Sequence, residues 1–245
     1  PFRLRRADIR LEPKQTGAIL RVGIPLAVQD FLVSVSFAVI LAIINSLGLT
    51  YSAGIGVAEK ICAFIMLVPS AYMQSMSAFV AQNIGAGRPD RAKQALRCGI
   101  LTAVAASLVL AYVSYFHGTA LAQIFANEQA VILAAADYLR AYAIDCVLTS
   151  FLFCFIGYFS GLGKTTFVLI QGIAGAFLVR IPVSFFASRR AGATLFQIGL
   201  ATPMSTVLQI LLCVGYLALL RRDAEKSKSV SKKAAEGSFF CIYAR

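Results

Sequence analysis

The chain has 245 residues, of which 59% are hydrophobic and only 14% are charged, with a mean hydropathy of +0.77. Soluble globular domains carry about 25% charged residues, so this composition excludes an ordinary soluble protein. The formal net charge of +12 would suggest nucleic-acid binding in a soluble protein, but here the basic residues lie between apolar stretches, which indicates membrane topology and contact with anionic lipid headgroups instead.

Six apolar stretches, each about twenty residues long, follow one another along the chain. They cover approximately residues 23 to 47, 54 to 82, 98 to 117, 139 to 160, 165 to 187 and 196 to 220. An α-helix crosses the ~30 Å hydrocarbon core in about 20 residues, whereas transmembrane β-strands are about half as long and alternate in polarity. The pattern therefore predicts an all-α membrane protein, with a bundle of six transmembrane helices over residues 23–220.

The segments that flank the bundle are basic. Residues 1–22 read as a basic, amphipathic approach segment, and residues 221–245 as a basic tail whose polar part we expect to be disordered. Further basic residues follow the second span at 88–97 and the fourth at Lys164, whereas the opposite loops contain only Arg189 and Arg190. By the positive-inside rule, both termini are cytoplasmic, and we expect a multi-pass protein of the plasma (inner) membrane.

Cysteine and histidine usage gives no sign of a metal site or a cofactor. The six cysteines include no C-x-x-C pair, and His117 is the only histidine. The segment Gly161–Thr165 resembles the end of a phosphate-binding loop, but Tyr158 stands where that motif needs glycine. We therefore predict no cofactor, no metal and no enzyme active site.

Polar residues inside the first two spans are the first functional candidates, because an ionisable side chain at the bilayer centre costs about 2.5–3.5 kcal/mol unless it is sheltered. Asp30 lies roughly 10 Å deep in the first span, by the 1.5 Å rise per residue of an α-helix, and Gln74 reaches a similar depth in the second. Asp30, with Gln29 and Gln74 nearby, either lines a polar cavity that binds a cation or proton, or makes a hydrogen-bonded contact between helices.

Two opposite charges lie in the fourth and fifth spans. Asp145 and Arg180 are at comparable distances from the outer ends of consecutive antiparallel helices, so we predict an ion pair. This pair is either structural or part of a network that binds the coupling ion.

Glu59 and Lys60 lie near the outer end of the second span and point about 100° apart on the helix. We expect interfacial anchoring, or for one of them a polar partner such as Asn45. Asp137 and Arg140 read as boundary charges at the outer start of the fourth span.

Prolines and glycines predict details of the helices. Pro69 and Pro182 each remove a hydrogen bond within a span and favour a kink. Gly157 and Gly161 form a G-x-x-x-G pattern, which is typical of close helix packing.

Several short segments, taken in their order and spacing, resemble one family of transporters. They are QNIGAGRPDRA at 82 to 92, GIP at 23 to 25, INSLG at 44 to 48, GLG at 161 to 163 and RIP at 180 to 182. Together they resemble the second half of the multidrug and toxic compound extrusion (MATE) transporters, over about residues 16–220. The family's functional acid of the fourth span aligns with Thr149, one turn after Asp145.

The resemblance implies one lobe of a twelve-helix antiporter that exports cationic or amphipathic drugs and toxic compounds in exchange for Na⁺ or H⁺. Small organic cations would be the substrates, and the partner would be the missing N-terminal lobe or a second copy. Because the chain opens at Pro1 without a methionine, we expect a piece that starts within a longer protein. The alternatives are a non-transporting bundle, as a truncated remnant or an accessory subunit, or a lipid-linked or polysaccharide flippase of the same superfamily.

Overall fold

The computed structural model describes residues 12–190, 192 and 194–242, with side chains as far as residue 223. Residues 1–11 of the predicted approach segment and residues 243–245 of the tail lie outside this part of the chain. Within the described ranges the chain is helical and contains no strand.

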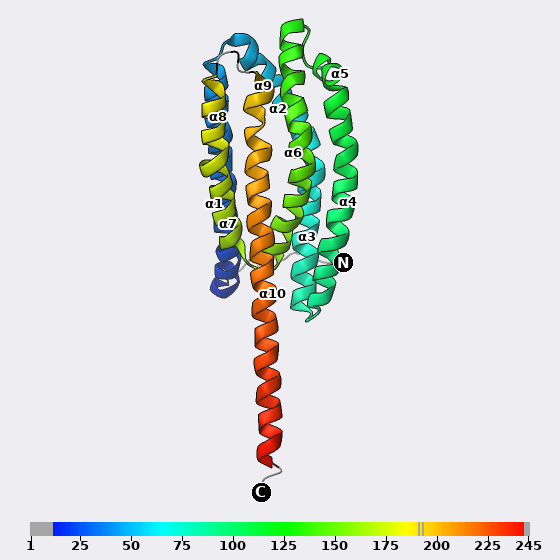
Figure 1. Ribbon diagram of the computed structural model, residues 1–245, viewed down its shortest axis with the longest axis vertical. Coiled ribbons are helices and arrows are strands. Elements are labelled where there is room, and N and C mark those ends of the chain that lie inside the picture. The colour runs from blue at the N-terminus through cyan, green and yellow to red at the C-terminus, as the bar shows by residue number, and fades with distance from the viewer. Residues whose placement is uncertain (1–11, 191, 193, 243–245) are drawn as a thin grey trace.

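Six helical rods, each long and apolar enough to cross a membrane, form the bundle in Figure 1. This confirms the predicted all-α architecture. The first four rods are α1 (Pro13–Asn45), α2 (Leu49–Ile65) with α3 (Leu67–Gly85), α4 (Pro89–Phe116) and, after the short α5 (Gly118–Gln123), α6 (Gln129–Gly161). The fifth rod is α7 (Thr165–Ile173), the π-helix η2 (Ala174–Arg180) and α8 (Ile181–Ser188), and the sixth is α9 (Leu195–Gly199) with α10 (Ala201–Ile242).

Helix α6 is the centre of the bundle. In its most apolar stretch 67% of the residues are buried, against 17% to 33% in the other five rods. It contacts α2, α3, α4, α5, α9 and α10, so its side chains are shielded from lipid on most sides. The helix begins at Gln129 rather than near residue 139, and Asp145 therefore lies at the midpoint of a 33-residue helix instead of near its outer end.

Proline interrupts two of the rods where the sequence predicted a disturbance. Pro69 has no N–H to offer the carbonyl of Ile65, and the second rod breaks at Met66, between α2 and α3. In the fifth rod, Pro182 is the second residue of α8, which follows the π-helical segment that ends at Arg180. A π-helical turn is wider than an α-helical one and is frequent at functional sites.

The G-x-x-x-G pattern of α6 packs against α3, as predicted. A Cβ atom on Gly161 would lie 2.7 Å from the carbonyl oxygen of Ser77 and 2.7 Å from the Cβ of Val80. Real Cβ atoms do not come so close, so only glycine allows this approach of the two helices. Gly157, one turn earlier, faces the carbonyl oxygen of Met73 in the same way.

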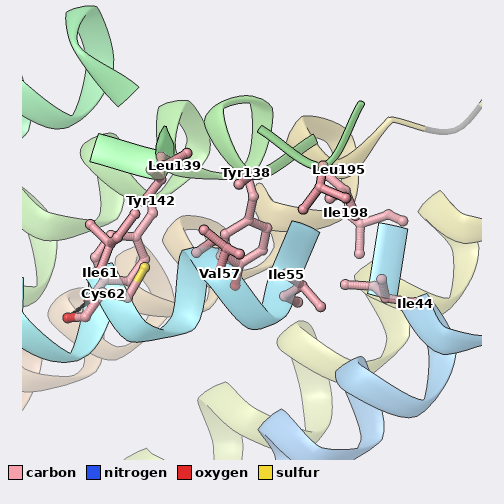
Figure 2. Close-up of a cluster of buried hydrophobic side chains, with 14 of the residues drawn as sticks. Ile44, Ile55, Val57, Ile61, Cys62, Tyr138, Leu139, Tyr142, Leu195 and Ile198 are labelled. Atoms are coloured by element: carbon pink, nitrogen blue, oxygen red, sulfur yellow. Dashed lines mark hydrogen bonds between the residues drawn. The ribbon is translucent and has the colours of Figure 1, made fainter. Parts of the chain in front are cut away.

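A cluster of buried apolar side chains joins α1, α2, α6 and α9 towards one end of the bundle, and Figure 2 shows most of its large members. Ile44 and Ile198 are 0% and 1% exposed, and Leu139 of α6 is fully buried. Dense packing of this kind holds α2 and α9 in fixed positions on α6.

The opposite end of the bundle carries the basic turns. Figure 1 shows that the α3–α4 turn and the α6–α7 turn both lie at the end from which α10 projects. Helix α10 continues as one helix to Ile242, so the prediction of a disordered polar tail is wrong for the described residues. Alanine and lysine are frequent in this segment, and both favour a helix.

Candidate functional site

A cavity of about 530 Å³ lies between α1, α3, α6, η2 and α10. Its volume falls within the range of small-molecule sites, roughly 300–1,000 Å³. Six of the eight residues predicted as binding candidates line it: Gln29, Asp30, Gln74, Asp145, Thr149 and Arg180. These six residues come from four of the six rods.

Asp145 is the most deeply placed of these residues, and its side chain is 1% exposed. Thr206 of α10 donates a hydrogen bond from Oγ1 to Oδ1 of Asp145 at 2.6 Å. Thr149, one turn along α6, donates to Oδ2 at 3.0 Å. A carboxylate has about four acceptor positions. Two remain free, so the site is held rigidly and still has capacity for a cation or a proton.

Arg180, at the end of η2, lines the same cavity and is 6% exposed. Its Nη1 donates a hydrogen bond to Ser36 Oγ at 3.2 Å, and its Cζ lies 4.4 Å from the centre of the Phe37 ring. Both contacts are with side chains of α1, the helix that forms one wall of the cavity.

The predicted direct ion pair between Asp145 and Arg180 does not form. Among the described residues, the one ion pair closer than 4.0 Å joins Lys93 and Asp90. Instead, Thr149 and Thr206 donate hydrogen bonds to the carboxylate of Asp145, and the guanidinium of Arg180 contacts α1. The two charges share a cavity without contacting each other.

Asp30 and Gln74 lie on α1 and α3 and are both exposed, although both line the cavity. The cavity is therefore open on the side where these residues lie. No hydrogen bond joins their side chains among those that the structure describes, so the alternative of a direct interhelical contact between them is not seen. Gln29 is 8% exposed, and α7 packs against it at Gly172, where a Cβ would lie 2.8 Å from Gln29 Cγ.

The other two candidates, Glu59 and Asn45, are outside the cavity lining. Glu59 is exposed on α2. No hydrogen bond to Asn45 is seen for Glu59 or Lys60 among the described residues; Asn45 Oδ1 instead accepts a hydrogen bond from Ser52 Oγ at 2.7 Å, next to the turn between α1 and α2.

Asp137, predicted as a boundary charge, has a structural contact inside the bundle. Its Oδ2 accepts a hydrogen bond at 2.9 Å from the backbone N–H of Phe196, in the first turn of α9. The first four N–H groups of a helix have no partner within the helix, so this carboxylate satisfies one of them.

Sequence reasoning missed the polar face of α10. Thr202, Thr206 and Gln209 all line the cavity and are at most 4% exposed. Their spacing of four and three residues places them on one helix face, and this signal was present in the sequence. Hydroxyl and amide side chains cost less to bury than charges, which makes them weaker pointers to a site.

Comparison with known proteins matches residues 25–186 to the family model MatE. The chain is 23% identical over 211 residues to the probable multidrug resistance protein YoeA of Bacillus subtilis, covering 86% of this chain and 46% of the relative. It is 24% identical over 229 residues to the multidrug resistance protein PmpM of Pseudomonas aeruginosa, covering 91% and 48%. The chain thus spans about half the length of the curated relatives it matches.

Solved structures show the same fold at low sequence identity. A crystal structure of MATE in the straight conformation aligns with a TM-score of 0.80 at 17% identity, over 91% of this chain and 50% of that chain. An outward-facing multidrug resistance MATE family transporter of the MOP superfamily aligns with a TM-score of 0.77 at 17% identity, over 83% and 45%.

Proposed function

This chain belongs to the MatE family, and on that premise we propose that it is one lobe of a secondary active exporter. The complete transporter would expel cationic or amphipathic drugs and toxic compounds in exchange for Na⁺ or H⁺. Two relatives that match most of this chain are named as multidrug resistance proteins, which supports this substrate class. No cofactor takes part in the proposal.

The observation that carries the proposal is the buried carboxylate of Asp145 at the midpoint of the central helix. Ionisable groups at this depth are costly in a membrane and mark ion or substrate pathways. The hydroxyls of Thr149 and Thr206 add two neutral oxygens next to the carboxylate, and oxygen ligands are the type that hard cations prefer.

Exchange follows if the coupling ion and a cationic substrate compete for this one carboxylate. A bound Na⁺ or H⁺ neutralises Asp145 and lowers the affinity of the cavity for an organic cation, and the bound organic cation has the same effect on the coupling ion. Each cation therefore promotes release of the other. This mutual exclusion is the thermodynamic requirement for antiport.

A second lobe would complete the cavity. Asp30 and Gln74 line the cavity and yet are exposed in this chain, so the open side is where another surface would lie. We propose that the missing N-terminal lobe or a second copy of this chain covers it. We also propose that both termini lie in the cytoplasm and the bundle in the plasma membrane, and the basic turns and tail support this orientation by the positive-inside rule.

Dye retention in cells tests the proposal. We expect cells that express this chain together with the first lobe of a full-length relative to expel rhodamine 123. Cells with either part alone should retain the dye if the first lobe is needed to complete the cavity wall, whereas efflux by this chain alone would show that a second copy completes it. Membrane fractions should contain equal amounts of the chain in all samples. Retention of the dye by the paired lobes, with both present in the membrane, would instead support the non-transporting bundle.

A further inference from the structure

The guanidinium of Arg180 is only partly satisfied. With the described side chains it makes one hydrogen bond, from Nη1 to Ser36 Oγ, while its buried Nε has no partner among them. No carboxylate of the described residues lies within 4.0 Å of it. The side chain is nevertheless 6% exposed and faces the cavity lining, so a full positive charge is held in the protein interior without a counter-ion in contact.

Such a charge is unfavourable where water is excluded. Arginine remains protonated under all ordinary conditions, and a buried charge is tolerated when it is paired and hydrogen-bonded. The face of Phe37 offsets part of this cost through a cation–π contact. Asp145 does not offset the rest by direct contact, because its oxygens are bonded to threonines of α6 and α10.

The cavity therefore offers two separate sites of opposite charge. Arg180 presents a planar guanidinium whose remaining donors suit a carboxylate, and Asp145 presents acceptors that suit a cation. The wall also includes Phe37, Phe153 and Met73, which provide apolar surface for a ring system.

We propose that Arg180 binds the carboxylate of the transported compound, so that the lobe favours amphiphiles that carry a carboxylate in addition to a cationic group. This inference rests on the proposed function, because it specifies the substrate class of the same cavity. The described side chains assign the two ends of such a molecule, with its carboxylate at Arg180 and its cationic group towards Asp145.

Two dyes that differ in a single group test this assignment. Rhodamine 110 has a free carboxylate, and rhodamine 123 is its methyl ester. We expect the full chain, in phosphatidylcholine nanodiscs, to bind rhodamine 110 about 10-fold more tightly than rhodamine 123 by fluorescence anisotropy, because charge-assisted hydrogen bonds to arginine are among the strong ones. Arg180→Met should abolish this preference, because the guanidinium that binds the carboxylate of rhodamine 110 is then absent.

Arg180→Met is chosen because methionine is long and flexible enough to fill the space of the arginine stem and removes a buried charge that has no ion-pair partner to leave behind. Arg180→Gln provides a second variant of similar size, with the same expected loss of preference. The matched control is Arg189→Gln, because Arg189 also lies 4.4 Å over a phenyl ring, that of Phe185, but is exposed and outside the cavity. This control should keep the 10-fold preference.

The inference is overturned if the wild-type chain binds both dyes equally, binds neither, or if either folded Arg180 variant keeps the preference for rhodamine 110. Its failure is distinguishable from failure of the proposed function, which is measured as efflux. Export of rhodamine 123 by the paired lobes without an Arg180-dependent preference would remove the inference alone. An Arg180-dependent preference without export would remove the proposed function alone.

Discussion

Replacing Asp145 with asparagine should reduce dye efflux by the paired lobes about 100-fold, which corresponds to roughly 3 kcal/mol, the upper range for hydrogen bonds to a charged group. Asparagine has nearly the same shape and still accepts a hydrogen bond from Thr149 or Thr206, so the helix packing around it is preserved. It has no charge, however, and holds neither a proton nor a cation. The measurement is the initial rate of rhodamine 123 efflux, normalised to protein in the membrane.

The control for this change is Asp137→Asn. Asp137 lies on the same helix α6, but it bonds to the start of α9 and is absent from the cavity lining. We expect this variant to lose some thermal stability and to keep most of its efflux. Wild-type rates in Asp145→Asn would show that the buried carboxylate has no part in transport.

A second change, Asp30→Asn, should raise the KM for a cationic dye about 10-fold and leave the maximal rate nearly unchanged. Asp30 is exposed at the open side of the cavity, and no side-chain hydrogen bond is seen to hold it among the described residues. A charge in this position attracts cations to the cavity rather than holding one in a fixed geometry. The concentration dependence of efflux separates the two effects.

Glu59→Gln is the matched control for Asp30→Asn, because Glu59 is an exposed carboxylate of the second rod outside the cavity. It should leave both KM and the maximal rate unchanged. Unaltered efflux in Asp30→Asn would show that Asp30 has no part in attracting the dye. A lower maximal rate would instead indicate that Asp30 binds the coupling ion together with Asp145.

The rods themselves were predictable because the thickness of a bilayer fixes the length of an apolar helix. The two proline interruptions and the close contact at Gly161 were also predictable, since each follows from the covalent structure of one residue. The outer part of α6 was not predicted, although residues 130–136 are all apolar, because the charges of Asp137 and Arg140 were taken as the boundary of the span.

The partners of each polar side chain were harder to predict. Sequence position gives the depth of a residue along its rod, but not the rotation of one rod against another. Asp145 and Arg180 were therefore placed in one region correctly, while their direct contact was predicted wrongly. Thr206 binds Asp145 from a helix sixty-one residues further along the chain, and no local pattern connects the two.

Transport by purified components tests the central claim most directly. This chain and the first lobe of a relative would be reconstituted together in liposomes, with a Na⁺ or H⁺ gradient imposed across the membrane. We predict that rhodamine 123 moves against its own gradient when Na⁺ or H⁺ flows down its gradient in the opposite direction. The Asp145→Asn variant should abolish this movement. Dye movement that proceeds equally without a cation gradient, or equally with Asp145→Asn, would contradict the account.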